Sequence, residues 1–394
     1  MTTSVSSGRP RTPVQPATRI AYVIDSVEGG GVAFPVPMVC RVLRDAGVHV
    51  EVFALTRRDG LALPPMLADG LTVHVREGSA HNLWAAHRWL GRELAAYQPT
   101  LIWTSLTRAT VIGLLLGKRR AIPVVCWQHS AYLKPLRRRL LYALRKRPAM
   151  WIGDSDMVTD ITARRFDVPP ERLASWPLFS ANPDAPQAQP WQPGRTLQLG
   201  SLGRLHRVKG ADVLVEALVL LKQRGFQSPV PFEITIAGDG REREALSNAA
   251  QRAGFNGLHL VGFTDQPGDF LAGLHLYLQP SRWEGFCIAM HEAMQAGLPV
   301  IASTVGQMPY TLEAGRSGWL VPPGDASALA DALADALSHP ERLATMGQAA
   351  RARVLPLYSA EAFRQAGESI LARLRERGVL PADAMMPPIE SADR

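Results

Sequence analysis

The chain repeats one pattern of secondary structure on both sides of a proline-rich stretch. An apolar strand over residues 20–24 runs into the glycine turn at Gly29 and Gly30, and further short strands then alternate with helical segments. The pattern restarts with a strand over residues 197–203 and continues to about residue 377. Because strands that alternate with helices form parallel βαβ units, the sequence predicts two α/β domains, each with a doubly wound parallel sheet.

A chain of 394 residues is too long to fold around a single hydrophobic core, and its length suits two such domains. The stretch between the repeats contains Pro183, Pro186, Pro190 and Pro193, a composition typical of an interdomain linker. The predicted divisions are a disordered leader (1–18), an N-terminal domain (19–180), a linker (181–195), a C-terminal domain (196–355), a final helix (356–377) and a disordered tail (378–394).

Composition excludes several classes of protein. No run of eighteen apolar residues lacks a charge or a breaker, so the sequence predicts no transmembrane helix. The leader is rich in Ser, Thr, Pro and Arg and has no apolar run of the kind found in signal peptides. Cys40, Cys126 and Cys287 are scattered and form no CxxC pair, which favours neither disulfides nor a zinc site. We therefore expect a cytoplasmic protein.

Positive charge is concentrated in the N-terminal half of the chain. Residues 1–180 hold 24 Lys and Arg against 13 Asp and Glu, whereas the remaining residues hold 19 against 22. Between Lys118 and Arg147 there are ten Lys and Arg and no acidic residue. This asymmetry indicates an anionic partner for the N-terminal half, either a nucleic acid or an anionic membrane surface.

The loop from Gly203 to Gly210 is the first segment that suggests chemistry. It follows a predicted strand, precedes a predicted helix and carries Arg204 and Lys209. Two cations beside a helix N-terminus, with free backbone N–H groups, suit a diphosphate. The alternative is a solvated basic loop.

A second segment, residues 281–292, carries two carboxylates. Glu284 falls at a strand-to-helix turn and Glu292 lies on the following helix, so both are expected to face the crevice at the ends of the strands. Carboxylates accept hydrogen bonds from vicinal hydroxyls of a ribose or a sugar. The alternatives are a turn cap for Glu284 and a solvated helix face for Glu292, although apolar residues surround Glu292.

These segments resemble the signature of the family-4 glycosyltransferases, which have the GT-B fold of two Rossmann-like domains facing across a cleft. The block that starts at Pro280 and Ser281, continues with Glu284-Gly-Phe and Glu292-Ala-Met and ends at Ser303 carries the resemblance. Other elements in the same order are Gly29-Gly30, Gly203-Arg204, Lys209-Gly210, Ala237-Gly-Asp-Gly240, Val261-Gly-Phe and Gly318-Trp-Leu-Val-Pro-Pro-Gly-Asp325. The resemblance spans residues 20–375.

The resemblance implies roles for individual residues. Arg204 and Lys209 would hold the donor diphosphate, Glu292 the ribose and Glu284 the donor sugar, while His129 would lie near the transferred sugar. The residues implied in catalysis are His129, Arg204, Lys209 and Glu284. The residues implied in donor binding are Gly29, Gly30, Gly203, Arg204, Lys209, Gly238, Val261, Glu284, Gly285, Phe286, Cys287, Ile288 and Glu292. Cys287 stands where the family commonly has Gly.

The resemblance also implies a reaction and its partners. The enzyme would retain anomeric configuration, need no metal and no cofactor, and use a nucleotide-diphosphate sugar, with a UDP-sugar favoured by frequency in the family. The acceptor would be a glycan or a lipid-linked molecule of cell-surface polysaccharide, lipopolysaccharide or glycolipid synthesis. The final helix would cross back to the N-terminal domain, and with the linker it would form a hinge for domain closure.

The basic segment predicts peripheral attachment to the inner face of a membrane. Residues 133–147 form an amphipathic helical pattern with clustered cations, which is typical of helices at anionic lipid surfaces. A solvated helix is the alternative. No nucleic-acid partner is predicted, because no nucleic-acid-binding fold is recognisable and the acidic C-terminal half would repel a phosphate backbone.

Three further functions compete. A nicotinamide oxidoreductase would need G-x-G-x-x-G and an acidic residue after the second strand, and both are missing. A sugar-nucleotide epimerase on the same fold would share Arg204 and the nucleotide site but needs acid and base carboxylates across the sugar. A non-catalytic binding protein is opposed by the intact set Arg204, Lys209, Glu284 and Glu292.

Overall fold

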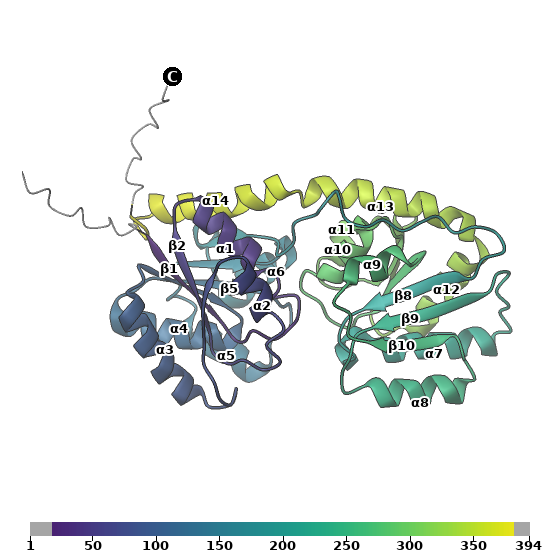
Figure 1. The fold of residues 1–394 in the computed structure, drawn as a ribbon, viewed down its shortest axis with the longest axis horizontal. Helices are drawn as coiled ribbons and strands as arrows, with labels where there is room; N and C mark the ends of the chain where they lie inside the picture. The colour runs from purple at the N-terminus through teal and green to yellow at the C-terminus, as the bar shows by residue number, and fades with distance from the viewer. Residues whose placement is uncertain (1–17, 382–394) are drawn as a thin grey trace, which may run out of the picture.

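The computed structural model describes residues 18–381, which form two α/β domains lying side by side (Figure 1). The first domain has a seven-stranded sheet in the order β3-β2-β1-β4-β5-β6-β7, and every neighbouring pair is parallel. Its strands are β1 (Arg19–Ile24), β2 (His49–Ala54), β3 (Thr72–Val75), β4 (Leu101–Ser105), β5 (Val124–Gln128), β6 (Met150–Gly153) and β7 (Leu173–Ser175).

The second domain repeats this plan with a six-stranded parallel sheet in the order β10-β9-β8-β11-β12-β13. Its strands are β8 (Leu197–Leu202), β9 (Phe232–Ala237), β10 (Leu258–Gly262), β11 (Leu276–Gln279), β12 (Val300–Ser303) and β13 (Gly318–Val321). Two Rossmann-like sheets in one chain constitute the GT-B architecture expected from the sequence.

Helices pack on both faces of each sheet. Those of the first domain are α1 (Val36–Asp45), α2 (Leu63–Ala68), α3 (Leu83–Tyr97), α4 (Thr107–Arg120), α5 (Pro135–Leu144), α6 (Asp156–Phe166) and the 3-10 turn η1 (Pro170–Arg172). The helices that come after β8 in the chain are η2 (Arg207–Lys209), α7 (Ala211–Gln223), α8 (Arg243–Ala253), α9 (Pro267–Ala272), α10 (Ile288–Gln295), α11 (Met308–Thr311), α12 (Ala326–Ser338), η3 (Pro340–Arg342), α13 (Leu343–Leu357) and α14 (Ala360–Glu376).

Strand β1 shows why the apolar runs fold this way. Ile20, Tyr22 and Ile24 point into the core that contains α1, whereas Ala21 and Val23 point into the opposite core with α3 and α4. A strand buried on both faces is apolar along its whole length rather than alternating. The continuous apolar runs of the sequence are therefore central strands of parallel sheets.

Helix α14 belongs to the packing of the N-terminal domain, although it ends the chain. It continues the line of α13 across the molecule and reaches α1 (Figure 1). Phe363, Ile370, Leu371 and Leu374 are buried in the same core as β1. Leu380 is buried there as well, so the assignment of residues 378–380 to a disordered tail is wrong; residues 1–17 and 382–394 lie outside the described part of the chain.

The two segments that connect the domains are held together. The Ala181 N–H donates to the Tyr358 carbonyl at 2.6 Å, which joins the segment after β7 to the segment before α14. The predicted linker is also anchored to the C-terminal domain, where the Ala188 N–H donates to the Ala296 carbonyl at 2.8 Å. After Asp325 the chain forms three long helices, α12, α13 and α14, and the last of them corresponds to the predicted final helix.

Truncating a buried α14 side chain tests this docking. Leu371→Ala is expected to lower the free energy of unfolding by about 2–4 kcal/mol, because the side chain is fully buried in the β1 core and its loss leaves a cavity. Leu136→Ala, at a position that is 77% exposed, is the control and should change little. Urea unfolding followed by tryptophan fluorescence measures both, because Trp103, Trp127 and Trp176 lie in the same core. Equal stability of the two variants would contradict the docking of α14.

Candidate active site

The C-terminal sheet places its loops at a switch in strand order. Strands β8 and β11 are neighbours in the sheet but are separated in sequence by β9 and β10. Such a switch leaves a crevice at the carboxyl ends of the strands, where open α/β sheets bind ligands. Gly203 and Arg204 follow β8, and Ser281 to Glu284 follow β11, so the two predicted ligand loops meet at this crevice.

Lys209 and Glu284 are in direct contact in the crevice. Lys209 Nζ lies 2.7 Å from Glu284 Oε1, and the two side chains are 29% and 10% exposed. Burial lowers the pKa of the Lys209 ammonium, but the Glu284 carboxylate outweighs this effect and leaves the pKa above its ordinary value. Lys209 is therefore charged at neutral pH, and two of its three N–H donors remain available for a ligand.

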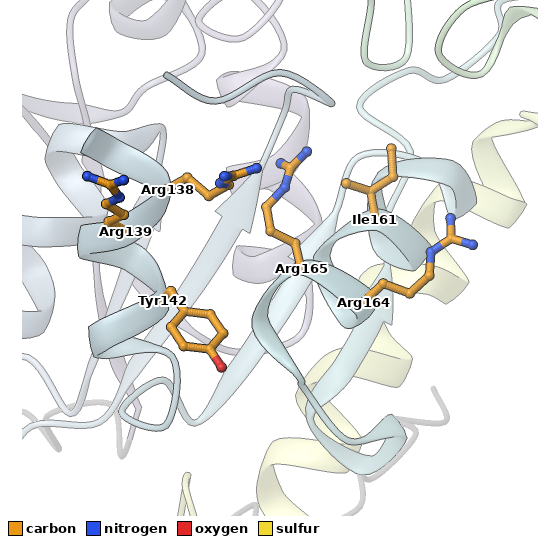
Figure 2. A pocket seen from close by; sticks show the side chains of 6 residues that line it. All are labelled: Arg138, Arg139, Tyr142, Ile161, Arg164 and Arg165. Atoms are coloured by element: carbon orange, nitrogen blue, oxygen red, sulfur yellow. The ribbon is translucent and has the colours of Figure 1, made fainter. Parts of the chain in front are cut away.

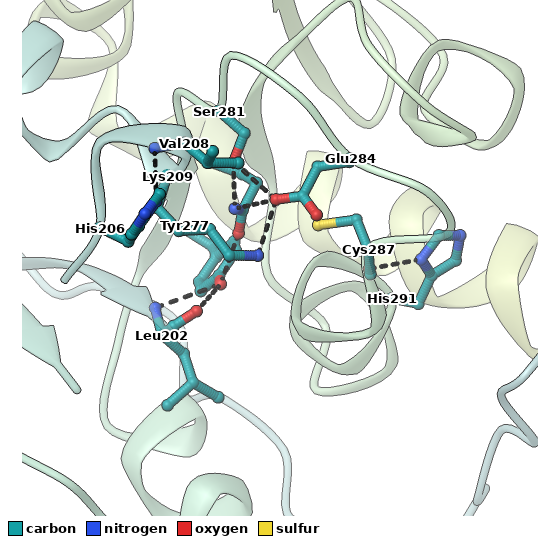
Figure 3. A network of polar contacts seen from close by, with 10 residues as sticks. Leu202, His206, Val208, Lys209, Tyr277, Ser281, Glu284, Cys287 and His291 are labelled. Carbon is teal, nitrogen blue, oxygen red and sulfur yellow. Dashed lines mark hydrogen bonds and ion pairs between the residues drawn. The ribbon is translucent and has the colours of Figure 1, made fainter. Parts of the chain in front are cut away.

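Glu284 is held by more than the lysine. Its Oε1 atom also accepts from Ser281 Oγ at 2.7 Å and from Gln279 Nε2 at 3.2 Å (Figure 3). The Tyr277 hydroxyl donates to Gln279 Oε1 at 2.8 Å and accepts from the Leu202 N–H at 3.2 Å. This polar network connects β8 to β11 and fixes one carboxylate oxygen, and the Cys287 thiol also hydrogen-bonds to the Glu284 side chain.

The residues that position Glu284 were not identified as a network from the sequence. Gln279 and Ser281 are fully buried polar side chains, 1% and 0% exposed, at the end of an otherwise apolar strand. Buried polar groups require hydrogen-bond partners, so a glutamine ending a buried strand close to a glutamate is a signal that could have found them.

Arg204 supplies a second cation at the crevice. Its side chain is exposed and forms no ion pair or side-chain hydrogen bond with the described residues 18–381. The positive charge of Arg204 also acts on Lys209 and lowers the pKa of that lysine. Of these two cations, only Lys209 is paired with a carboxylate among the described residues, so the crevice carries an excess of positive charge that suits an anionic ligand.

The start of α10 adds backbone donors. The N–H groups of Phe286, Cys287 and Ile288 have no acceptor within the part of the chain that the structure describes, and they precede or open the helix. Free N–H groups and the positive end of a helix dipole bind anions. Cys287 adopts φ 67°, a conformation that favours glycine and explains why a glycine is common at this position.

His291 fixes the conformation of this turn. Burial lowers the pKa of His291 to about 4, so the ring is neutral and its Nδ1–H donates to the Cys287 carbonyl at 2.9 Å. Its Nε2 atom then accepts from the Thr311 hydroxyl at 3.0 Å. The ring also stacks on Phe286 with a centroid distance of 3.9 Å. His291 is thus a positioning residue for the donors at the start of α10.

Glu292 differs from Glu284 in having no partner among the described residues. Its carboxylate forms no hydrogen bond or ion pair with any described residue between 18 and 381, and it is half-buried on the second turn of α10. Burial raises the pKa of Glu292 to about 7. A half-buried carboxyl group without a partner can accept hydrogen bonds from ligand hydroxyls.

His129 forms the opposite wall, in the N-terminal domain. Its Nε2 atom lies 2.7 Å from Ser105 Oγ and its Nδ1 atom 3.6 Å from Asp154 Oδ2, and its side chain is 1% exposed. Gly285 of the C-terminal domain packs directly on this wall, because a Cβ atom there would lie 2.4 Å from the His129 carbonyl oxygen. Ser105 and Asp154 are contacts of His129 that the sequence analysis did not identify.

Both domains therefore contribute to one site. Gly31, beside Gly29 and Gly30, faces Ile288 of α10: a Cβ atom at Gly31 would lie 3.4 Å from the Ile288 side chain. Tyr132 and Trp283 meet across the crevice with ring centroids 5.5 Å apart. The first contact places Gly31 of the N-terminal glycine turn beside the start of α10, and the second joins the two domains at another point of the crevice.

The remaining predicted donor residues lie along the ends of β8, β9 and β10. Gly238 packs on Gly203, since a Cβ atom at Gly238 would lie 1.9 Å from the Gly203 carbonyl oxygen. The Gly238 N–H donates to the Gly262 carbonyl at 2.6 Å. Val261 is 57% exposed, so the structure offers this segment as a surface beside the crevice and not as a closed pocket.

Comparisons with known proteins agree with this architecture. A family model described as glycosyl transferases group 1 matches residues 187–353, and one described as glycosyltransferase family 4 matches residues 29–179. The chain belongs to the family-4 glycosyltransferases. The family-4 match ends just before the predicted linker and the group 1 match begins within it, so each model corresponds to one of the two domains.

Individual relatives are similar over part of their length. The amylovoran biosynthesis glycosyltransferase AmsK of Erwinia amylovora is 36% identical over 188 residues, which cover 45% of each chain. The lipopolysaccharide core biosynthesis mannosyltransferase LpsB of Rhizobium meliloti is 30% identical over 41% of this chain and 48% of its own length. The alignments thus span about half of these relatives.

Solved structures show the same fold. HepE of Anabaena, in complex with UDP-glucose, superposes with a TM-score of 0.77 at 19% identity, covering 90% of this chain and 99% of that one. Sucrose-phosphate synthase of Thermosynechococcus elongatus gives a TM-score of 0.73 at 22% identity, with 91% and 100% covered. Both comparisons confirm the GT-B fold of this family-4 glycosyltransferase.

The ionisation of Glu292 is testable without a ligand. The folded protein holds a proton on Glu292 up to about pH 7, whereas the unfolded chain releases it near its ordinary pKa of 4.5. Stability should therefore fall as pH rises from about 4.5 to 7, by up to about 2 kcal/mol because the group is partly open to solvent. Glu292→Gln should lack this component, and urea unfolding of both proteins across this pH range measures it. Parallel pH profiles for the two proteins would contradict the raised pKa.

Proposed function

We propose that this chain is a retaining, metal-independent glycosyltransferase that transfers a sugar from a nucleotide-diphosphate donor to a glycan or lipid-linked acceptor. The observation that carries the proposal is the excess of positive charge at the β8–β11 crevice, where Arg204 and Lys209 meet the free N–H groups at the start of α10. The diphosphate leaves with a large negative charge, and preorganised cations and dipoles stabilise that charge as it develops.

The donor would span the crevice from β10 to the domain interface. Lys209 and Arg204 would hold the diphosphate, and the Glu292 carboxyl would accept from the ribose hydroxyls. Glu284 has one oxygen fixed by three donors, so its second oxygen would accept from a hydroxyl of the transferred sugar. The backbone beside Val261 would contact the base. HepE, with the same fold, binds UDP-glucose, which supports a UDP-sugar as donor.

The acceptor would approach from the N-terminal domain. The backbone of His129 packs against Gly285 and its side chain is held by Ser105, so His129 would contact the transferred sugar once the domains separate enough to admit the donor. The names of AmsK and LpsB refer to amylovoran and lipopolysaccharide core biosynthesis. We therefore propose an acceptor of cell-surface polysaccharide or glycolipid synthesis.

Two alternatives remain to be separated from this reaction. A sugar-nucleotide epimerase would use the same nucleotide site but would convert the donor without any acceptor. A non-catalytic, membrane-associated binding protein would bind the N-terminal partner without turnover. Release of UDP that depends on an added acceptor distinguishes the transferase from both.

Nucleotide binding is tested by thermal shift with UDP, GDP, ADP and dTDP. One nucleotide is expected to raise the melting temperature of the wild type, because bound ligand stabilises the folded state. Lys209→Ala should abolish most of this shift, since it removes a charge-assisted contact to the diphosphate. Lys118→Ala, which removes an exposed lysine of α4, is the matched control and should keep the shift. No shift with any nucleotide would refute the donor site.

Attachment to the cytoplasmic face of a membrane is a separate part of the proposal. Within residues 18–381, no helix has both the length and the apolar character needed to cross a bilayer. The basic segment between Lys118 and Arg147 would instead bind anionic headgroups, and this attraction should weaken with salt. Flotation with anionic liposomes is expected at low salt and reduced at high salt; absence of flotation in both would contradict attachment.

A further inference from the structure

A hollow between α5 and α6 is lined largely by arginines. Its walls are Arg138, Arg139 and Tyr142 of α5 and Ile161, Arg164 and Arg165 of α6 (Figure 2). Figure 2 shows the guanidinium groups of Arg138 and Arg165 extending toward each other between the helices, with Arg139 and Arg164 on either side. Two of the four arginines lie on α6, outside the basic segment that the sequence singled out.

No carboxylate in the described part of the chain pairs with the arginines of this hollow. None of the four arginines forms an ion pair in the described range 18–381. Asp160 lies one turn before Arg164 on α6, but it is exposed and makes no ion pair with it. Burial lowers the pKa of Arg165, and the nearby charge of Arg138 lowers it further. An anion bound between the two guanidinium groups would remove this repulsion.

Helix α5, which forms one wall of the hollow, also carries exposed apolar side chains. Every residue from 134 to 140 is exposed, so the first half of α5 projects from the domain, which it contacts through the buried Leu141 and Leu144. Leu136 is 77% exposed and Leu140 is 43% exposed. They are four residues apart and so share one side of the helix. A helix that carries both exposed leucines and arginines without ion pairs among the described residues matches a ligand with a charged head and an apolar chain.

The hollow is connected to the crevice by one loop. Arg165 donates from Nη2 to the Ala131 carbonyl, two residues after His129. This contact fixes one arginine of the hollow to the loop that carries the N-terminal wall of the crevice. A ligand held at Arg165 is therefore attached on the acceptor side of the molecule.

We propose that Arg138 and Arg165 form a clamp for the phosphomonoester headgroup of a membrane lipid. Two guanidinium groups can each make paired hydrogen bonds to phosphate oxygens, and a phosphomonoester offers more charge and more free oxygens than a phosphodiester. Arg139 and Arg164 add positive charge on the flanks, and Leu136 and Leu140 contact the acyl region. The clamp makes the membrane attachment proposed above selective for one headgroup, and it is independent of donor binding.

Vesicle sedimentation with the full-length protein tests the clamp. The probes are phosphatidylcholine vesicles that contain either phosphatidic acid or phosphatidylglycerol, matched in surface potential. The wild type is expected to bind phosphatidic acid more tightly than phosphatidylglycerol. Arg138→Gln with Arg165→Gln should lose about tenfold more affinity for phosphatidic acid than for phosphatidylglycerol, because paired contacts to phosphate exceed the general attraction of a surface cation.

The control removes the same charge elsewhere in the same domain. Lys118→Gln with Arg119→Gln changes two exposed cations of α4 that form no ion pair in the described chain, and it should weaken binding to both vesicles equally. Equal affinity of the wild type for the two lipids, or equal losses in the two double variants, would overturn the clamp. So would soluble glycerol phosphate that binds as tightly as the vesicles, since this result would identify a free phosphate as the ligand.

Two measurements keep the test independent of folding and of the donor site. The single variant Arg138→Gln leaves the Arg165 contact to Ala131 in place and should still lose the preference for phosphatidic acid. The UDP-induced thermal shift should persist in all variants, because the hollow lies outside the β8–β11 crevice. If the Arg138→Gln variant keeps both the UDP shift and the preference for phosphatidic acid, the result contradicts the clamp and leaves the proposed donor site unaffected.

Discussion

The contact between Lys209 and Glu284 is the interaction on which the candidate site depends. It joins the loop after β8 to the loop after β11 and so closes the base of the crevice. A half-buried ion pair is stable only if its remaining hydrogen-bonding capacity is satisfied. Here Ser281 and Gln279 satisfy the same carboxylate oxygen, and Tyr277 orients Gln279, so the pair is part of a fixed network.

This network has a consequence for the charge of the site. Glu284 neutralises one cation, but the crevice also contains Arg204 and the backbone donors at the start of α10, which have no protein partner in residues 18–381. His291, held neutral by burial, orients the turn that presents these donors. A second concentration of positive charge lies on the N-terminal domain, where four arginines line the hollow between α5 and α6. Both surfaces have the charge that suits phosphate groups.

The position of α14 is explained by the burial of its apolar side chains. The apolar face of α14 is buried in the N-terminal domain, whereas α12 and α13 are buried in the cores of the C-terminal domain. It crosses to the N-terminal domain, where Phe363 contacts Trp176 at a ring distance of 5.2 Å. The hydrogen bond from Ala181 to Tyr358 joins the two crossing segments. Any change in the angle between the domains must therefore be accommodated at this pair of segments.

The sequence determined the two-domain α/β fold, since the period of its apolar runs and the position of its glycines depend only on local geometry. It also singled out Arg204, Lys209, Glu284 and Glu292, because loops that follow parallel strands gather at one edge of a sheet. It could not show that Gln279 and Ser281 hold Glu284, or that Arg138 faces Arg165. Those pairs depend on side-chain directions and on which helices become neighbours, and only tertiary packing decides them.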